Sequence, residues 1–140
     1  MLYEEFLVKP YDFIVPAYKG IRQYTFLDHS DTEYKVQFVQ KNNNFTSFLM
    51  DLSVSFDDND EYETVNSRDV FKKMSTVIHI LNHFIESNTY CTTIEFTPVN
   101  EVGKKINRRE HLFERYIRSF TAKIHWKYQI LNQKFILTKK

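Results

Sequence analysis

The chain has 140 residues, of which 42% are hydrophobic and 16% aromatic, so we expect one domain with a sizeable core and no disordered majority. Its single cysteine, Cys91, excludes an intramolecular disulfide and a zinc site built on several cysteines, which favours a reducing compartment. The net charge of +1 is unlike that of the clearly basic domains that bind nucleic acid.

The beginning of the chain predicts neither secretion nor a membrane anchor. Glu4 and Glu5 stand where a signal peptide would carry lysines, and no apolar run approaches the roughly 20 residues of a membrane span. We therefore expect one cytoplasmic domain over residues 1–140 that does not enter a membrane.

Period-two alternation predicts three antiparallel strands in the first part of the chain. Tyr24 and Phe26 begin the pattern, Tyr34–Phe38 repeat it after a turn, and Phe48–Phe56 form its clearest stretch. The polar runs Lys41–Asn44 and Asp57–Glu61 are typical of loops.

The period then changes to that of a helix, with an apolar stripe from Val70 to Ile85. Asn66 or Ser67 is placed to cap its free amide groups, and Ser87 and the asparagine after it end it. The β-rich segment Cys91–Thr97 follows, so that a strand, a helix and a strand occur in succession.

A second helix is predicted from Asn107, followed by two strands. One side of this helix is apolar and the other is basic, with Leu112, Phe113, Tyr116, Ile117 and Phe120 on the apolar side. A strand over Trp126–Leu131, a turn at Asn132 and Gln133, and a last strand through Phe135 complete the chain. The predicted fold is a single α+β domain of order β-β-β-α-β-α-β-β, with a mixed, mostly antiparallel sheet packed against two amphipathic helices.

Charge is distributed unevenly along the chain. Residues 1–70 hold 13 acidic and 6 basic side chains, whereas residues 104–140 hold 11 basic and 2 acidic ones. Such polarity is typical of a surface for nucleic acid or an acidic partner, and it is equally compatible with two halves that neutralise each other in the fold.

The patterns of possible ligands predict no metal site and no thiol chemistry. His79 and His83 are spaced to share a ligand on one helix, but the sequence suggests only Glu86 as a third donor, so we interpret them as solvated or packed side chains. Cys91 lacks a recognisable catalytic context and is expected to act as a small hydrophobic residue. Trp126 and Tyr128 are interpreted as core residues of the closing strand, with exposed stacking partners as the alternative.

From Tyr24 to Lys139, the order of elements resembles the core of the GNAT N-acetyltransferase fold. In addition, Thr64–Val77 (TVNSRDVFKKMSTV) and parts of Ile94–Tyr116 (IEFTPVN, an arginine at 109 and LFERY) resemble small uncharacterised proteins of tailed bacteriophages. The resemblance implies a degenerate GNAT-like domain with its core at about residues 24–139, present in the host cytoplasm or in a virion.

The GNAT resemblance implies acetyl-CoA binding at the turn before the first long helix. Members of that family usually place glycines there, because bare amides approach the pyrophosphate at a helix N-terminus. This chain has Phe71 and Lys73 where small residues belong, and Phe113 where the family commonly has the tyrosine that serves as general acid. Both differences favour a retained fold that has lost its chemistry.

Three hypotheses follow. The first is a non-enzymatic protein without a cofactor that binds a macromolecular partner, expected to be a protein, through the basic helix at Arg108, Arg109, Arg115 and Arg118. The second is a divergent N-acetyltransferase that binds acetyl-CoA with the side chains of Asn66, Ser67, Arg68 and Lys72. The third is a nucleic-acid binder whose affinity falls steeply with salt.

Overall fold

The computed structural model describes residues 9–18, 22–52, 67–97 and 107–140, and for residues 67–70 and 107–112 it describes the backbone alone. The described strands are β1 (Phe13–Ile14), β2 (Gln23–Leu27), β3 (Glu33–Lys41), β4 (Asn44–Leu52), β5 (Thr93–Phe96), β6 (Trp126–Leu131) and β7 (Lys134–Lys139). The described helices are α2 (Ser67–Ser87) and α3 (Asn107–Ile124).

The described strands form one mixed sheet in the order β1-β2-β3-β4-β5-β7-β6. Neighbouring strands are antiparallel except for β4 and β5, which are parallel and are joined through α2. The mostly antiparallel sheet and both helices confirm the predicted class. The predicted order is wrong in one respect, because β1 precedes the three expected strands; two residues are too few to show an alternating pattern.

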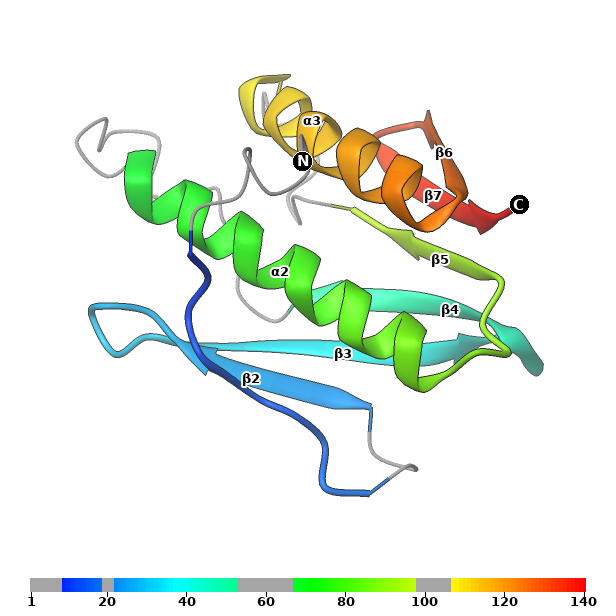
Figure 1. Cartoon of the computed structure of the whole chain (residues 1–140), viewed down its shortest axis with the longest axis horizontal. Coiled ribbons are helices and arrows are strands. Elements are labelled where there is room, and N and C mark those ends of the chain that lie inside the picture. Colours follow the sequence, from blue (N-terminus) through cyan, green and yellow to red (C-terminus); the bar gives the residue numbers. More distant parts are fainter. Residues whose placement is uncertain (1–8, 19–21, 53–66, 98–106) are drawn as a thin grey trace.

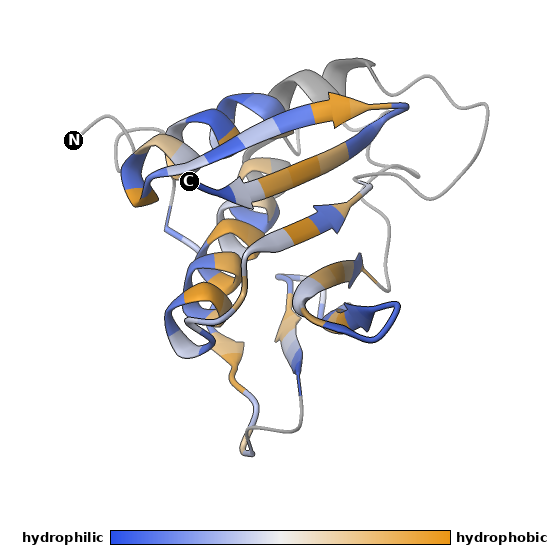
Figure 2. Ribbon diagram, turned by 90° about the vertical axis from the view of Figure 1, so that its right-hand side faces the viewer, coloured by the Kyte–Doolittle hydropathy of each residue, from blue (hydrophilic) through white to orange (hydrophobic). Residues whose placement is uncertain are grey.

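Both helices lie on one face of the sheet, and no helix of the described residues lies on the other (Figures 1 and 2). The strands therefore alternate between core and surface: β3, for example, buries Tyr34, Val36 and Phe38 and exposes the residues between them. We call the side without a helix the open face of the sheet.

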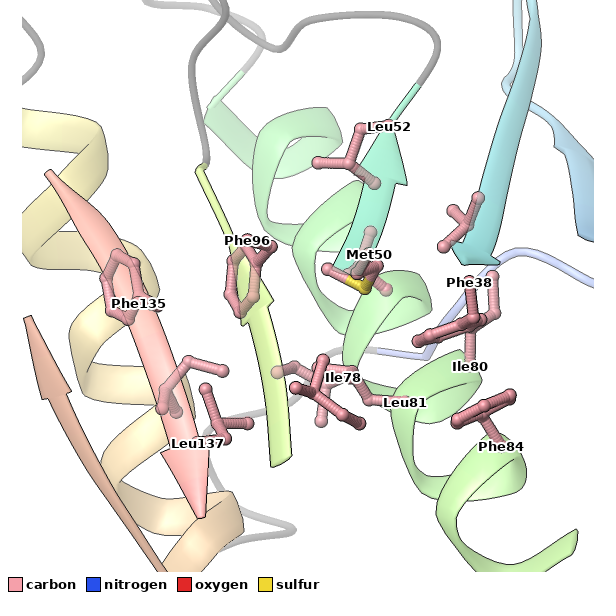
Figure 3. Close-up of a cluster of buried hydrophobic side chains, with 14 of the residues drawn as sticks. Phe38, Met50, Leu52, Ile78, Ile80, Leu81, Phe84, Phe96, Phe135 and Leu137 are labelled. Atoms are coloured by element: carbon pink, nitrogen blue, oxygen red, sulfur yellow. The ribbon is translucent and has the colours of Figure 1, made fainter. Parts of the chain in front are cut away.

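Aromatic and aliphatic side chains from the sheet meet those of α2 in the core (Figure 3). The rings of Phe38 and Phe84 are stacked, with centroids 3.9 Å apart, and Phe48 contacts Phe84 edge-on at 5.1 Å. Closer to α3, Phe96 stacks on Phe135 at 5.2 Å. These contacts join β3 and β4 to α2, and β5 to β7, within one core.

The burial of α2 is broader than the predicted apolar stripe, since Lys73, Ser75 and Thr76 are buried as well. The segment before β1 covers this side of the helix: the backbone N–H of Tyr11 donates a hydrogen bond of 2.9 Å to Oγ1 of Thr76. That contact joins residues 65 positions apart, so the sequence pattern of α2 could not indicate it.

Two-residue turns connect β3 to β4 and β6 to β7. Asn42 and Asn43 have φ values of 46° and 63°, and Asn132 and Gln133 have values of 51° and 67°. Left-handed backbone at both central residues matches the twist of antiparallel hairpins, and asparagine tolerates it well. The predicted turn at Asn132 and Gln133 is confirmed.

The boundaries of two predicted strands need correction. Of the strand predicted over Phe48–Phe56, the described part ends at Leu52, and residues 53–56 lie outside the described residues. The strand predicted over Cys91–Thr97 is confined to Thr93–Phe96, because Cys91 donates its N–H to the Asn88 carbonyl in a turn that follows α2. The loop predicted at Asp57–Glu61 and the cap predicted at Asn66 also lie outside the described residues.

We predict that Phe84→Ala lowers the free energy of unfolding by about 3–5 kcal/mol, since it removes a buried ring that contacts two other rings. Urea unfolding measures the change. Phe45→Ala is the matched control, because 61% of Phe45 is exposed and its truncation leaves no cavity. An equal loss in both variants would contradict this account of the core.

Candidate functional site

The basic helix proposed from the sequence is α3, and its two faces differ as expected. Phe113, Tyr116 and Ile117 are buried against the core, whereas Arg115 and Arg118 are exposed. Arg108 and Arg109 lie in the first turn of α3, but their side chains are not among those described. The structure thus places two of the four predicted contact arginines on the surface.

Arg118 belongs to a small polar network that joins α3 to β6. The hydroxyl of Tyr128 donates a hydrogen bond of 2.9 Å to Oε2 of Glu114, and Nε of Arg118 donates one of 3.4 Å to the Tyr128 oxygen. Nη2 of Arg118 lies 3.7 Å from the same Glu114 oxygen, yet 62% of the Arg118 side chain remains exposed. Trp126 is buried, which confirms its interpretation as a core residue, whereas Tyr128 is only partly buried and packs against the core.

The residues proposed for acetyl-CoA binding are only partly described. Asn66 lies outside the described residues, and Ser67 and Arg68 are described by backbone alone in the first turn of α2. The ammonium group of Lys72 lies 4.5 Å above the centroid of the Tyr11 ring, a cation–π contact with the segment before β1. The crowding predicted at the turn before α2 stays a prediction, since residues 53–66 are not described.

Lys73 points into the protein and forms a buried ion pair that the sequence analysis missed. Its Nζ lies 3.8 Å from Oδ2 of Asp28 and 4.9 Å from the centroid of the Tyr34 ring. Asp28 also accepts hydrogen bonds from the backbone N–H groups of Ser30 and Thr32, at 2.8 and 2.9 Å. A buried charge is costly unless it is paired, so this cluster fixes the β2–β3 turn against α2.

The parallel strands β4 and β5 pair over only a short length. Ser47–Leu49 of β4 pair with Thr93–Glu95 of β5, and this pairing does not extend to Met50–Leu52. On its other edge, β5 pairs with β7 along its whole length, from Thr93 to Phe96. Among the described residues, β4 and β5 therefore pair over three residues each.

Among the described residues, Glu95 is the most buried carboxylate of the open face. Nζ of Lys41 donates a hydrogen bond to its Oε2, and Nζ of Lys134 lies 3.4 Å from Oε1, while the Glu95 side chain is only 8% exposed. The hydrogen bond from Lys41 lowers the pKa of the Glu95 carboxyl; burial opposes this shift, and the charges of both lysines add to it. Because side chains alternate along β5, Glu95 points to the open face while Ile94 and Phe96 point to the core. The pairing of the strands, which the sequence pattern does not give, brings the two lysines to Glu95.

The histidine pair on α2 makes hydrogen bonds within the protein. Burial raises the pKa of Tyr24 to about 12, and its hydroxyl forms a hydrogen bond of 2.8 Å with Nδ1 of His83. Nδ1 of His79 lies 2.8 Å from the Ser75 carbonyl oxygen, to which it donates. Among the described residues, no three His, Cys, Asp or Glu side chains lie together as metal ligands.

Two further groups considered for chemistry are buried. Burial raises the pKa of Cys91 to about 11, so its thiol is not poised as a nucleophile. Burial also raises the pKa of Tyr116, which lies one helical turn beyond Phe113.

Of the described helices, neither is long and apolar enough to cross a membrane. The cytoplasmic location stays a prediction.

Comparison of the chain with protein-family models, with curated proteins and with solved structures gave no match.

We predict that Glu95→Gln destabilises the protein at pH 7 and that the loss shrinks as the pH falls. The pKa of a glutamate in the unfolded chain is about 4.3, whereas the two lysines hold the pKa of folded Glu95 below its usual range. Its contribution is therefore present above the unfolded value and is lost as the pH falls through the folded one. Urea unfolding of both proteins across this interval measures the difference.

Asp51→Asn is the control for this measurement, because Asp51 is an exposed carboxylate on the same face. A difference between wild type and Glu95→Gln that stays constant from pH 7 to pH 3 would show that the ion pairs of Glu95 do not contribute through its charge.

Proposed function

We propose that this chain is a GNAT-like domain that binds an acidic macromolecular partner through α3 and does not transfer an acyl group. The GNAT-like part of the proposal is supported by the order of elements. An antiparallel meander leads through α2 to a parallel strand, and α3 then leads to a final hairpin whose last strand, β7, lies between β5 and β6. The relation to small proteins of tailed bacteriophages belongs to the same proposal.

The loss of chemistry is supported by the groups available for proton transfer. Phe113, at the position of the general acid, is a fully buried phenyl ring that has no proton to donate. Tyr116 is buried nearby with a raised pKa, which makes its hydroxyl a weaker acid. Glu95 is held in its charged form by Lys41 and Lys134, which makes it a weaker base.

The observation that carries the binding function is the exposed basic face of α3. Arg115 and Arg118 are three residues apart and therefore lie on one side of the helix, opposite the buried Phe113 and Ile117. Arginine presents a planar fork of donors that suits carboxylates. Glu114 partly offsets Arg118, so a partner has to compete with an intramolecular contact of 3.7 Å.

Double charge reversal on α3, Arg115→Glu with Arg118→Glu, is expected to abolish capture of the partner while the fold is retained, because both side chains are exposed. Bead-bound wild-type and variant proteins are compared by quantitative mass spectrometry of what they retain. The matched control is Lys35→Glu with Lys127→Glu, two exposed residues of the sheet. Each double variant changes the net charge from +1 to −3, a difference of four.

Equal loss in both double variants would indicate a general charge effect, and undiminished capture by the α3 variant would remove α3 as the contact surface. A partner that proves to be RNA or DNA, with an affinity that falls steeply with salt, would favour the nucleic-acid hypothesis.

A divergent acyltransferase is the second candidate, and the short pairing of β4 with β5 is the observation that favours it. Among the described residues, Met50–Leu52 have no strand partner on the β5 side, so their backbone groups on that side could meet a ligand. Under this hypothesis Asn66, Ser67, Arg68 and Lys72 would hold the acetyl-CoA phosphates by side chains.

We expect isothermal titration calorimetry with acetyl-CoA to give no heat of binding at millimolar ligand, since the glycines that let backbone amides approach a pyrophosphate are missing from Arg68–Lys73. Lys72→Ala serves as the paired variant. A micromolar affinity that this variant weakens would replace the binding proposal with the acyltransferase.

A further inference from the structure

The turns at one end of the sheet bring two exposed aromatic rings together. Phe45 is 61% exposed and Tyr90 is 40% exposed, and their ring centroids lie 6.2 Å apart. Phe45 follows the β3–β4 turn, whereas Tyr90 lies in the turn between α2 and β5, so two distant parts of the sequence build the pair. We call these two rings the aromatic pair.

An irregularity in β4 places Phe45 outside the regular ladder. Lys41 pairs with Asn44, but the preceding residue, Gln40, pairs with Phe48, so residues 45–47 have no opposite residue on β3. Such bulges redirect side chains at the edges of sheets. Tyr90 packs on the core through Phe48, which is fully buried and whose ring centroid lies 6.2 Å from that of Tyr90.

Cationic side chains adjoin the aromatic pair. Thr92 donates its N–H to the Thr46 carbonyl at 2.8 Å, and Lys139 donates its own to the Thr92 carbonyl at 2.9 Å, so the end of β7 lies beside both turns. Figure 1 shows these segments together at the end of the sheet where the C-terminus lies. The Lys139 ammonium group donates to the Thr89 carbonyl at 3.2 Å, one residue before Tyr90, and Lys140 is exposed next to it.

A further cation, Arg22, lies just before β2 and contacts the ring beneath the aromatic pair, not the pair itself. The guanidinium carbon of Arg22 lies 5.2 Å from the centroid of Phe48, the ring that supports Tyr90. The last turn of α2, which precedes the turn of Tyr90, carries an exposed carboxylate, Glu86.

We propose that the aromatic pair is a stacking platform for single-stranded nucleic acid, with Lys139 and Lys140 as contacts to phosphates. Exposed rings flanked by cations are the combination by which proteins bind single strands without strong sequence preference. Because the two rings touch each other, bases stack on their outer faces and are not inserted between them. This surface lies on the turns and does not depend on the function proposed for α3.

The test is fluorescence anisotropy with a labelled single-stranded oligothymidylate and the full chain. Phe45→Ala and Tyr90→Ala are each expected to weaken binding about tenfold, through loss of base stacking. Leu131→Ala is the matched control, because Leu131 is an exposed apolar residue of the β6–β7 hairpin, 53% exposed. Its affinity should equal that of wild type.

The phosphate contacts are tested by the salt dependence. Lys139→Gln should reduce the slope of log affinity against log salt by about 0.7, the value for one contact to a single strand. Lys127→Gln removes one exposed charge elsewhere on the sheet and should leave the slope unchanged.

An abasic strand of the same length separates stacking from charge, because it keeps every phosphate and has no bases. We expect it to bind at least tenfold more weakly than oligothymidylate, roughly the value of one stacked base. The proposal is overturned if the abasic strand binds equally well, if Phe45→Ala behaves like Leu131→Ala, or if wild type binds no single strand at all. Binding that is lost in Arg115→Gln with Arg118→Gln and kept in the aromatic variants would assign it to α3 instead.

Discussion

The packing of α2 against the sheet is the contact on which the rest of the structure depends. β4 and β5 are parallel, so a crossover must connect them, and α2 is that crossover. The stack of Phe38 on Phe84 and the edge contact from Phe48 bind the helix to β3 and β4. The buried pair Lys73–Asp28 and the hydrogen bond from Tyr11 to Thr76 then secure the other side of α2.

Covering the sheet with helices on one side only has consequences for the other side. Residues of the open face alternate with core residues. Where a charged residue of that face is nonetheless nearly buried, its charge must be paired. Glu95 illustrates this: its neighbours in the register are apolar, and the carboxylate remains charged because Lys41 and Lys134 reach it from either side. The same ion pairs that stabilise the charge of Glu95 lower its pKa and so make it a weaker base.

The two surfaces proposed for binding are built in different ways. The basic face of α3 lies on the side of the helix opposite the buried Phe113 and Ile117, so its arginines reach solvent. Glu114 and Tyr128 contact one of these arginines, Arg118. The aromatic pair exists only because two turns and the end of β7 converge, so its residues share no sequence pattern. Long arginine side chains suit an acidic protein surface, whereas rigid exposed rings suit bases.

The sequence by itself determined the class of fold, both helices and the β6–β7 hairpin with its turn at Asn132 and Gln133, because periodicity and turn preferences are local. It also indicated that Arg115 and Arg118 face away from the core. Only the tertiary structure decided the order of strands, the partners of Glu95 and Lys73, and the meeting of Phe45 with Tyr90. Those features join residues far apart along the chain, and their register is fixed by packing that no local pattern encodes.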